Sequence, residues 1–63
     1  MATATFIERQ TYKHEPATDW YVVDGKEYGL TDDNRIIDSD GCPLTTGDDE
    51  EVKVRRAIEA AQK

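Results

Sequence analysis

Carboxylates are the most numerous reactive side chains in this 63-residue chain, and they are unevenly placed. Eight of them fall between Asp32 and Glu51, where Arg35 is the only cation. Three explanations compete for this segment: a cation site, ordinary solvated turns followed by a helix start, or an acidic surface that receives a basic partner. Each explanation makes a different demand on the neighbouring residues.

The DSDG segment from Asp38 to Gly41 resembles part of a calcium-binding loop. Such a loop needs oxygen ligands at positions 1, 3 and 5, a glycine at position 6 and a glutamate at position 12. With Gly41 at position 6, Ile36 falls at position 1 and Gly47 at position 12, so two ligands are missing. Asp-Gly clusters are also common in turns, because the Asp side chain hydrogen-bonds nearby backbone. We therefore expect a turn here, with no bound metal and no cofactor.

Nucleophilic catalysis finds little support in the sequence. His14 is the only histidine and Cys42 the only thiol, and they lie in distant segments. The glycines stand singly in turn-like contexts, so no glycine-rich phosphate loop is present. Paired carboxylates could exchange protons only in a cleft that shifts one pKa, and a domain this small is expected to enclose no such pocket. The sequence predicts a protein that is not an enzyme, with no catalytic residues.

The formal charge of −6 is distributed asymmetrically. Residues 1–16 carry two acids and two bases, residues 17–51 carry eleven acids and two bases, and residues 52–63 carry one acid and four bases. An acidic middle repels polyanions, so we expect neither direct nucleic-acid binding nor attachment to an anionic membrane.

The length predicts a single domain over residues 1–63 with a small core and marginal stability. Cys42 is the only cysteine, so no internal disulfide can form, and a partner or a homodimer would help to stabilise the fold. A lone thiol is typical of a reducing compartment. The first ten residues lack a signal-peptide pattern, and no apolar run approaches a membrane span. We expect the chain to be cytoplasmic.

Two β-hairpin-like units are predicted after an N-terminal strand. Residues 3–13 are rich in β-formers, and simple alternation would place the side chains of Phe6, Glu8, Gln10 and Tyr12 on one face. Asp24-Gly25 lies between two β-rich runs and predicts a two-residue type I′ turn. This turn sets a register for the strands. It pairs Val23 with Lys26, Val22 with Glu27 and Tyr21 with Tyr28, and it places Tyr21, Val23, Tyr28 and Leu30 on one face and Trp20 and Val22 on the other.

A second unit, residues 35–45, repeats the pattern of two β-branched residues, an Asp and a Leu-Thr ending, which predicts a β-meander. Residues 48–63 predict a helix with Asp48 as N-cap and Glu51 completing a capping box, although Thr46 with Asp49 is an alternative cap. One apolar stripe is predicted on this helix, made of Val54, Ala57, Ile58 and Ala61. The expected fold is α+β: a small antiparallel meander of three or four strands with one C-terminal helix packed on one face.

The aromatic residues are interleaved with acids rather than bases, which argues against a platform for single-stranded nucleic acid. We expect most of them in the core. A single helix covers only one face of a sheet, so Trp20 and its neighbours could be partly exposed and anchor an interface.

In its size, acidity and lack of a catalytic constellation, the chain resembles the small phage-encoded inhibitors of bacterial defence, in particular anti-CRISPR proteins that act as DNA mimics. The resemblance lies at the level of class and is carried by the acidic segments DDNRIIDSDG and GDDEE. It implies stoichiometric binding to a basic nucleic-acid-binding surface, such as that of a Cas effector complex, which would block access of DNA or RNA. The alternative is a small homodimeric structural or housekeeping module of phage or bacterial origin, whose acidity serves solubility.

The residues predicted to contact the partner are the following: Asp19, Trp20, Tyr21, Asp32, Asp33, Asp38, Asp40, Asp48, Asp49 and Glu50.

Overall fold

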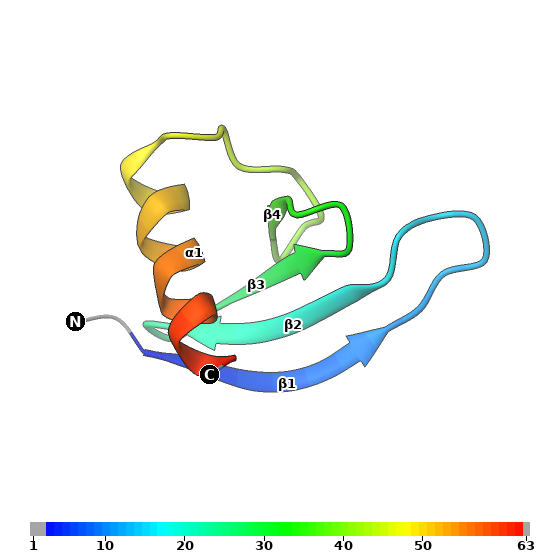
Figure 1. Ribbon diagram of the computed structural model, residues 1–63, viewed down its shortest axis with the longest axis horizontal. Coiled ribbons are helices and arrows are strands. Elements are labelled where there is room, and N and C mark those ends of the chain that lie inside the picture. Colours follow the sequence, from blue (N-terminus) through cyan, green and yellow to red (C-terminus); the bar gives the residue numbers. More distant parts are fainter. Residues whose placement is uncertain (1–2, 63) are drawn as a thin grey trace.

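The computed structural model describes residues 3–62, which form a four-stranded antiparallel sheet and one helix. The elements are β1 (Ala4–Gln10), β2 (Thr18–Val23), β3 (Lys26–Thr31), β4 (Ile36–Asp38) and α1 (Asp49–Ala61). The strands neighbour one another in chain order, so the sheet is a meander, and α1 lies across one face of it (Figure 1). The predicted α+β architecture is confirmed. β1 ends at Gln10, three residues before the predicted end, and residues 11–17 form a protruding loop to β2 (Figure 1).

The turn between β2 and β3 has the predicted geometry. Asp24 has φ 53° and Gly25 has φ 80°, which matches the positive φ that both central positions of a type I′ turn require. Val23 pairs with Lys26 beside the turn, and the predicted register continues through Tyr21 and Tyr28. The turn therefore fixes which residues of β2 and β3 face the helix.

A bulge in β1 overturns the predicted alternation of that strand. Phe6 pairs with Tyr21 and Glu8 pairs with Trp20, so the register shifts at Ile7. Because Trp20 and Tyr21 are adjacent in β2, their side chains point to opposite faces, and so do their partners. The prediction that Phe6 and Glu8 share a face is therefore wrong, since an inserted residue reverses the alternation beyond it.

The core lies between α1 and one face of the sheet. Val54, Ala57 and Ile58 of α1 are buried there against side chains from all four strands: Ala4, Tyr21, Val23, Tyr28 and Ile36. Ala61 is exposed, so the predicted apolar stripe ends at Ile58.

Asp48 is the N-cap of α1 as predicted, but its side chain makes no capping hydrogen bond, and the predicted capping box is absent. Glu51 is instead only 2% exposed, and its carboxylate accepts from Arg55 at 2.8 Å and from the Gly47 backbone at 3.4 Å. Glu51, predicted to complete the capping box, thus forms an ion pair with Arg55 in which the carboxylate is buried.

The DSDG segment folds as the predicted turn after β4. Asp38 Oδ1 accepts hydrogen bonds from the backbone N–H groups of Asp40 and Cys42, each at 2.9 Å. The chain then returns to pair Pro43 with Ile37. The hairpin-like character predicted for this second unit is confirmed, with a single bridge in place of a full strand.

Candidate binding surface

The face of the sheet opposite α1, here called the open face, carries no helix among the described residues (Figure 1). Trp20, Val22 and Ile37 are half-buried on it. Trp20 lies directly across from Gly29 of β3. A Cβ at Gly29 would stand 2.5 Å from Thr18 Cγ2 and 3.0 Å from Ile37 Cγ1. The absence of a side chain at Gly29 therefore lets Thr18 and Ile37 pack closely against the backbone of β3.

A groove of about 450 Å³ runs along the open face. Trp20, Ile37 and Pro43 supply apolar lining, and Tyr12 extends the groove from the β1–β2 loop. Gln10 links the two aromatic residues, because its Oε1 accepts from Trp20 Nε1 at 3.0 Å and from the Tyr12 hydroxyl at 2.8 Å. The aromatic rings are therefore positioned by a shared acceptor, and the groove is open to solvent.

Carboxylates line the same groove. Glu15, Asp33 and Asp40 belong to its lining, together with the single cation Arg35. Arg35 Nε is 3.7 Å from Asp33 Oδ2, a loose and exposed pair. The Thr31 hydroxyl also donates to Asp33, which orients that carboxylate. We call the groove with its three carboxylates the acidic groove.

A second groove of about 470 Å³ lies beside the start of α1, and three carboxylates, Glu27, Asp38 and Glu50, line it together with one cation, Lys26. Ser39 contributes to the lining of both grooves, so the two acidic surfaces adjoin one another around the turn that follows β4. The Tyr28 hydroxyl donates to Glu50 Oε2 at 2.5 Å. This hydrogen bond to a carboxylate, followed by burial, raises the pKa of Tyr28 to about 12.

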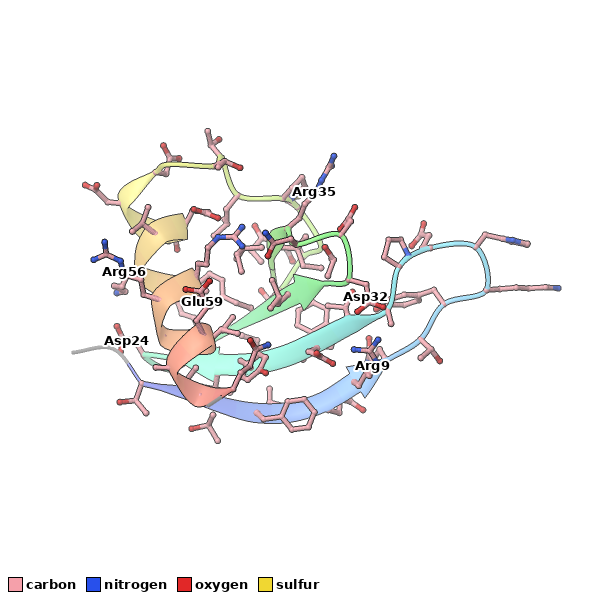
Figure 2. The ribbon with its side chains drawn as sticks, viewed as in Figure 1. Arg9, Asp24, Asp32, Arg35, Arg56 and Glu59 are labelled. Carbon is pink, nitrogen blue, oxygen red and sulfur yellow. The ribbon has the colours of Figure 1, made fainter. Side chains whose placement is uncertain are left out.

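Two of the predicted contact residues are already engaged within the protein. Arg9 Nη1 is 3.0 Å from Asp19, and Arg9 Nη2 is 2.8 Å from Asp32 Oδ2 (Figure 2). The hydrogen bond that Arg9 donates to Asp32, followed by the one that it donates to Asp19, raises the pKa of Arg9 above its usual value. The sequence did not indicate this pairing, which arises because the β1 bulge places Arg9 opposite Asp19.

Tyr21 is 5% exposed and belongs to the core, so its prediction as an interface anchor is also wrong. Asp48 and Asp49 are exposed at the start of α1, and within residues 3–62 no cation lies within ion-pair distance of them. The structure therefore brings together Asp33, Asp40 and Trp20 at one groove and Asp38 and Glu50 at the other.

The sequence alone did not indicate that Tyr12, Glu15 and Glu27 belong to these surfaces. Nothing in the sequence of the β1–β2 loop indicated where Glu15 would lie, because the position of Glu15 depends on how residues 11–17 return to β2. Glu27 could have been found, since the predicted hairpin register already placed it beside Val22 on the open face.

Another ion pair lies at the opposite end of the molecule, where Lys53 Nζ is 2.8 Å from Asp24 Oδ2. The hydrogen bond and charge of Lys53 lower the pKa of Asp24. This pair ties the β2–β3 turn to α1.

His14 and Cys42 are both exposed. Within residues 3–62 there is no group of three or more His, Cys, Asp or Glu side chains arranged to hold a metal ion. The helix in the described part of the chain is neither long nor apolar enough to cross a membrane.

Comparisons with protein-family models, with curated proteins and with solved structures found no match.

Proposed function

We propose that this chain is a non-enzymatic inhibitor that binds a basic, nucleic-acid-binding surface of a partner protein and blocks access of DNA or RNA to it. The observation that supports this proposal most is the acidic groove, which Glu15, Asp33 and Asp40 line together with half-buried Trp20 and a single cation, Arg35. Carboxylates at this position would pair with Lys and Arg side chains that otherwise hold phosphates. Trp20 would supply apolar contact, or a cation–π contact to Arg.

The net charge of the protein is too small for it to imitate the phosphate charge of a whole DNA duplex. The molecule is 35 Å long and carries a net charge of −6. Duplex DNA of that length carries about 20 phosphate charges, at one per about 1.7 Å of axis. Imitation of a whole duplex is therefore not what we propose. The two adjoining grooves instead gather carboxylates around the turn that follows β4, which suits competition for a local cluster of basic residues.

By the resemblance noted for the sequence, the partner class that we propose is a bacterial defence effector of the CRISPR type, encountered in the bacterial cytoplasm. Binding would be stoichiometric and would need no cofactor.

The test is a binding titration against a purified Cas effector complex at two salt concentrations. A variant carrying Asp33→Asn and Asp40→Asn should bind at least tenfold more weakly than the unchanged chain, and the difference should shrink as salt rises, because screening weakens the contribution of these charges.

The matched control carries Asp24→Asn and Glu59→Gln. It loses the same two charges, but Asp24 lies at the β2–β3 turn and Glu59 on α1, away from the acidic groove (Figure 2). Asn-Gly is also a favoured type I′ turn sequence, so the hairpin is retained. Equal loss in both variants would assign binding to net charge alone and contradict a localised site.

A further inference from the structure

The exposed large apolar side chains of the described chain are confined to one segment. Phe6 is 54% exposed and Ile7 43% exposed in β1, and Tyr12 is 42% exposed just beyond that strand. Phe6 makes an edge-on contact with Tyr21, with ring centroids 5.4 Å apart, yet half of its surface remains open to solvent. A segment of this kind on a small domain marks an interaction surface.

β1 is also an edge strand. The strand order β1-β2-β3-β4 leaves one side of β1 without a partner strand among residues 3–62. The opposite edge, β4, has only three residues and is paired further by Pro43. An unpaired strand edge is a template for pairing with another chain.

Edge strands are usually protected by charges or bulges, and in β1 this protection covers only the second half. The bulge lies at Ile7, and Glu8 and Arg9 follow it. The first half, from Ala4 to Phe6, is uncharged. The unprotected part of the edge thus contains one of the two exposed apolar side chains of β1, Phe6, and adjoins the other, Ile7.

The charge distribution favours a second copy of this chain as the partner that pairs with the β1 edge. A second copy of a chain with net charge −6 is repelled by most of the surface of the first. Residues 1–16 carry two acids and two bases, so the region that contains β1 is neutral. A basic partner would gain nothing electrostatically at this edge, whereas an identical acidic chain meets its least repulsion there.

We infer that the protein forms a homodimer in which the β1 edges of two copies pair antiparallel over their uncharged halves, Ala4–Phe6, so that Phe6 and Ile7 lie in the interface. A two-fold axis perpendicular to the sheet joins the two four-stranded sheets into one. Both α1 helices then lie on one side of it, and both open faces lie on the other. This inference does not rest on the proposed function, although a dimer would present two acidic grooves on the same face.

The experiment is sedimentation of the unchanged chain, of Ile7→Lys and of Tyr12→Lys. Concentrations from about 10 µM to about 1 mM cover the change from mostly monomer to mostly dimer for a Kd of about 100 µM. The unchanged chain should move from 7.1 kDa toward twice that mass. Ile7→Lys should remain at the monomer mass, and Tyr12→Lys, equally exposed but outside β1, should still dimerise.

Lysine makes this comparison stringent. Each variant changes the net charge from −6 to −5, which reduces overall repulsion and would promote dimerisation if the interface lay elsewhere. A monomer at every concentration, or an Ile7→Lys protein that dimerises like the unchanged chain, would overturn the inference. If Ile7→Lys fails to fold, hydrogen exchange of the unchanged chain decides: the β1 amides should gain protection as its concentration rises, and unchanged exchange would overturn the inference. Dimerisation that Tyr12→Lys abolishes and Ile7→Lys does not would place the interface at the open face instead, and would also overturn it.

Discussion

Arg55 Nη2 lies 2.6 Å from Glu51 Oε2, one helical turn away, in an ion pair whose carboxylate is almost completely buried. The same guanidinium donates to Asn34 Oδ1 at 2.8 Å and to the Asn34 carbonyl oxygen at 2.9 Å. Asn34 has φ 69° in the turn between β3 and β4. One arginine therefore pairs with a buried charge and fastens α1 to the turn between β3 and β4.

Replacing Arg55 with Met should lower the free energy of unfolding by about 2–4 kcal/mol. Loss of one partner of a buried ion pair leaves an uncompensated charge, and the partial exposure of Arg55 places the cost in the lower part of the usual range. Urea denaturation measures this change. Arg56→Met is the control, because Arg56 is exposed on the outer side of α1 (Figure 2). Equal losses in the two variants would show that the buried pair contributes nothing specific.

Gly29→Ala should destabilise the sheet by about 1–3 kcal/mol, as expected for overpacking. The added Cβ would meet Thr18 Cγ2 at 2.5 Å, and Thr18 is itself buried. Thr18→Ser removes that methyl group. In a double-mutant cycle, Gly29→Ala should therefore cost less in the Thr18→Ser background. Additive losses would contradict a direct clash between these two residues.

Gly25→Val should destabilise the fold by at least about 1–2 kcal/mol, because a non-glycine residue pays this much at positive φ and a β-branched one pays more. Apart from its two chain neighbours, no residue has an atom within 4 Å of the position that a Cβ would occupy, so backbone strain at positive φ is the expected cause of the loss. Gly25→Asn should be tolerated better, since Asn adopts positive φ readily. Thermal melts of the two variants measure the difference, and equal melting temperatures would refute the strain argument.

Stability should fall as the pH rises from 10 to 12. The pKa of Tyr28 is raised to about 12 by its hydrogen bond to Glu50, whereas an unfolded tyrosine titrates near its ordinary value of 10.0. The unfolded state therefore loses its proton first, and the stabilisation present below pH 10 is lost as the pH rises through 12.

This difference between the folded and unfolded pKa of Tyr28 corresponds to a loss of at most about 3 kcal/mol in the free energy of unfolding. Solvent screening near the hydroxyl reduces this figure. Denaturation at pH 9 and at pH 12 measures the loss. The Tyr28→Phe protein should lose less than the unchanged chain between the same two values. The Asp24–Lys53 pair weakens in both proteins over this range and so cancels in the comparison.

Local signals predicted most of the fold. Asp24-Gly25 fixed the register of β2 and β3 because a two-residue turn leaves no freedom in pairing. The helix followed from its residue types and apolar spacing. The bulge at Ile7 could not be predicted, because it depends on how β1 packs against β2. The ion pairs of Arg9 were missed for the same reason, since they join residues from three separate segments.

The candidate surface was predicted only in part. Exposed acids after β3 and around the turn after β4 were identified by their sequence, but whether each would find a cation depends on tertiary contacts. Asp32 forms an ion pair with Arg9, whereas Asp40 lines the acidic groove. Tyr21 and Trp20 are neighbours of similar character, and only the pairing of β2 decides which one enters the core.

Displacement of nucleic acid tests the proposed inhibition most directly. A fluorescently labelled DNA target bound to a Cas effector complex is titrated with the unchanged chain, with the Asp33→Asn, Asp40→Asn variant and with the Asp24→Asn, Glu59→Gln control, and anisotropy reports the released DNA. We expect stoichiometric release by the unchanged chain and the control, and at least tenfold weaker release by the groove variant. If the unchanged chain releases no DNA from any basic effector tested, or if the groove variant competes as well as the control, the acidic groove is not an inhibitory surface.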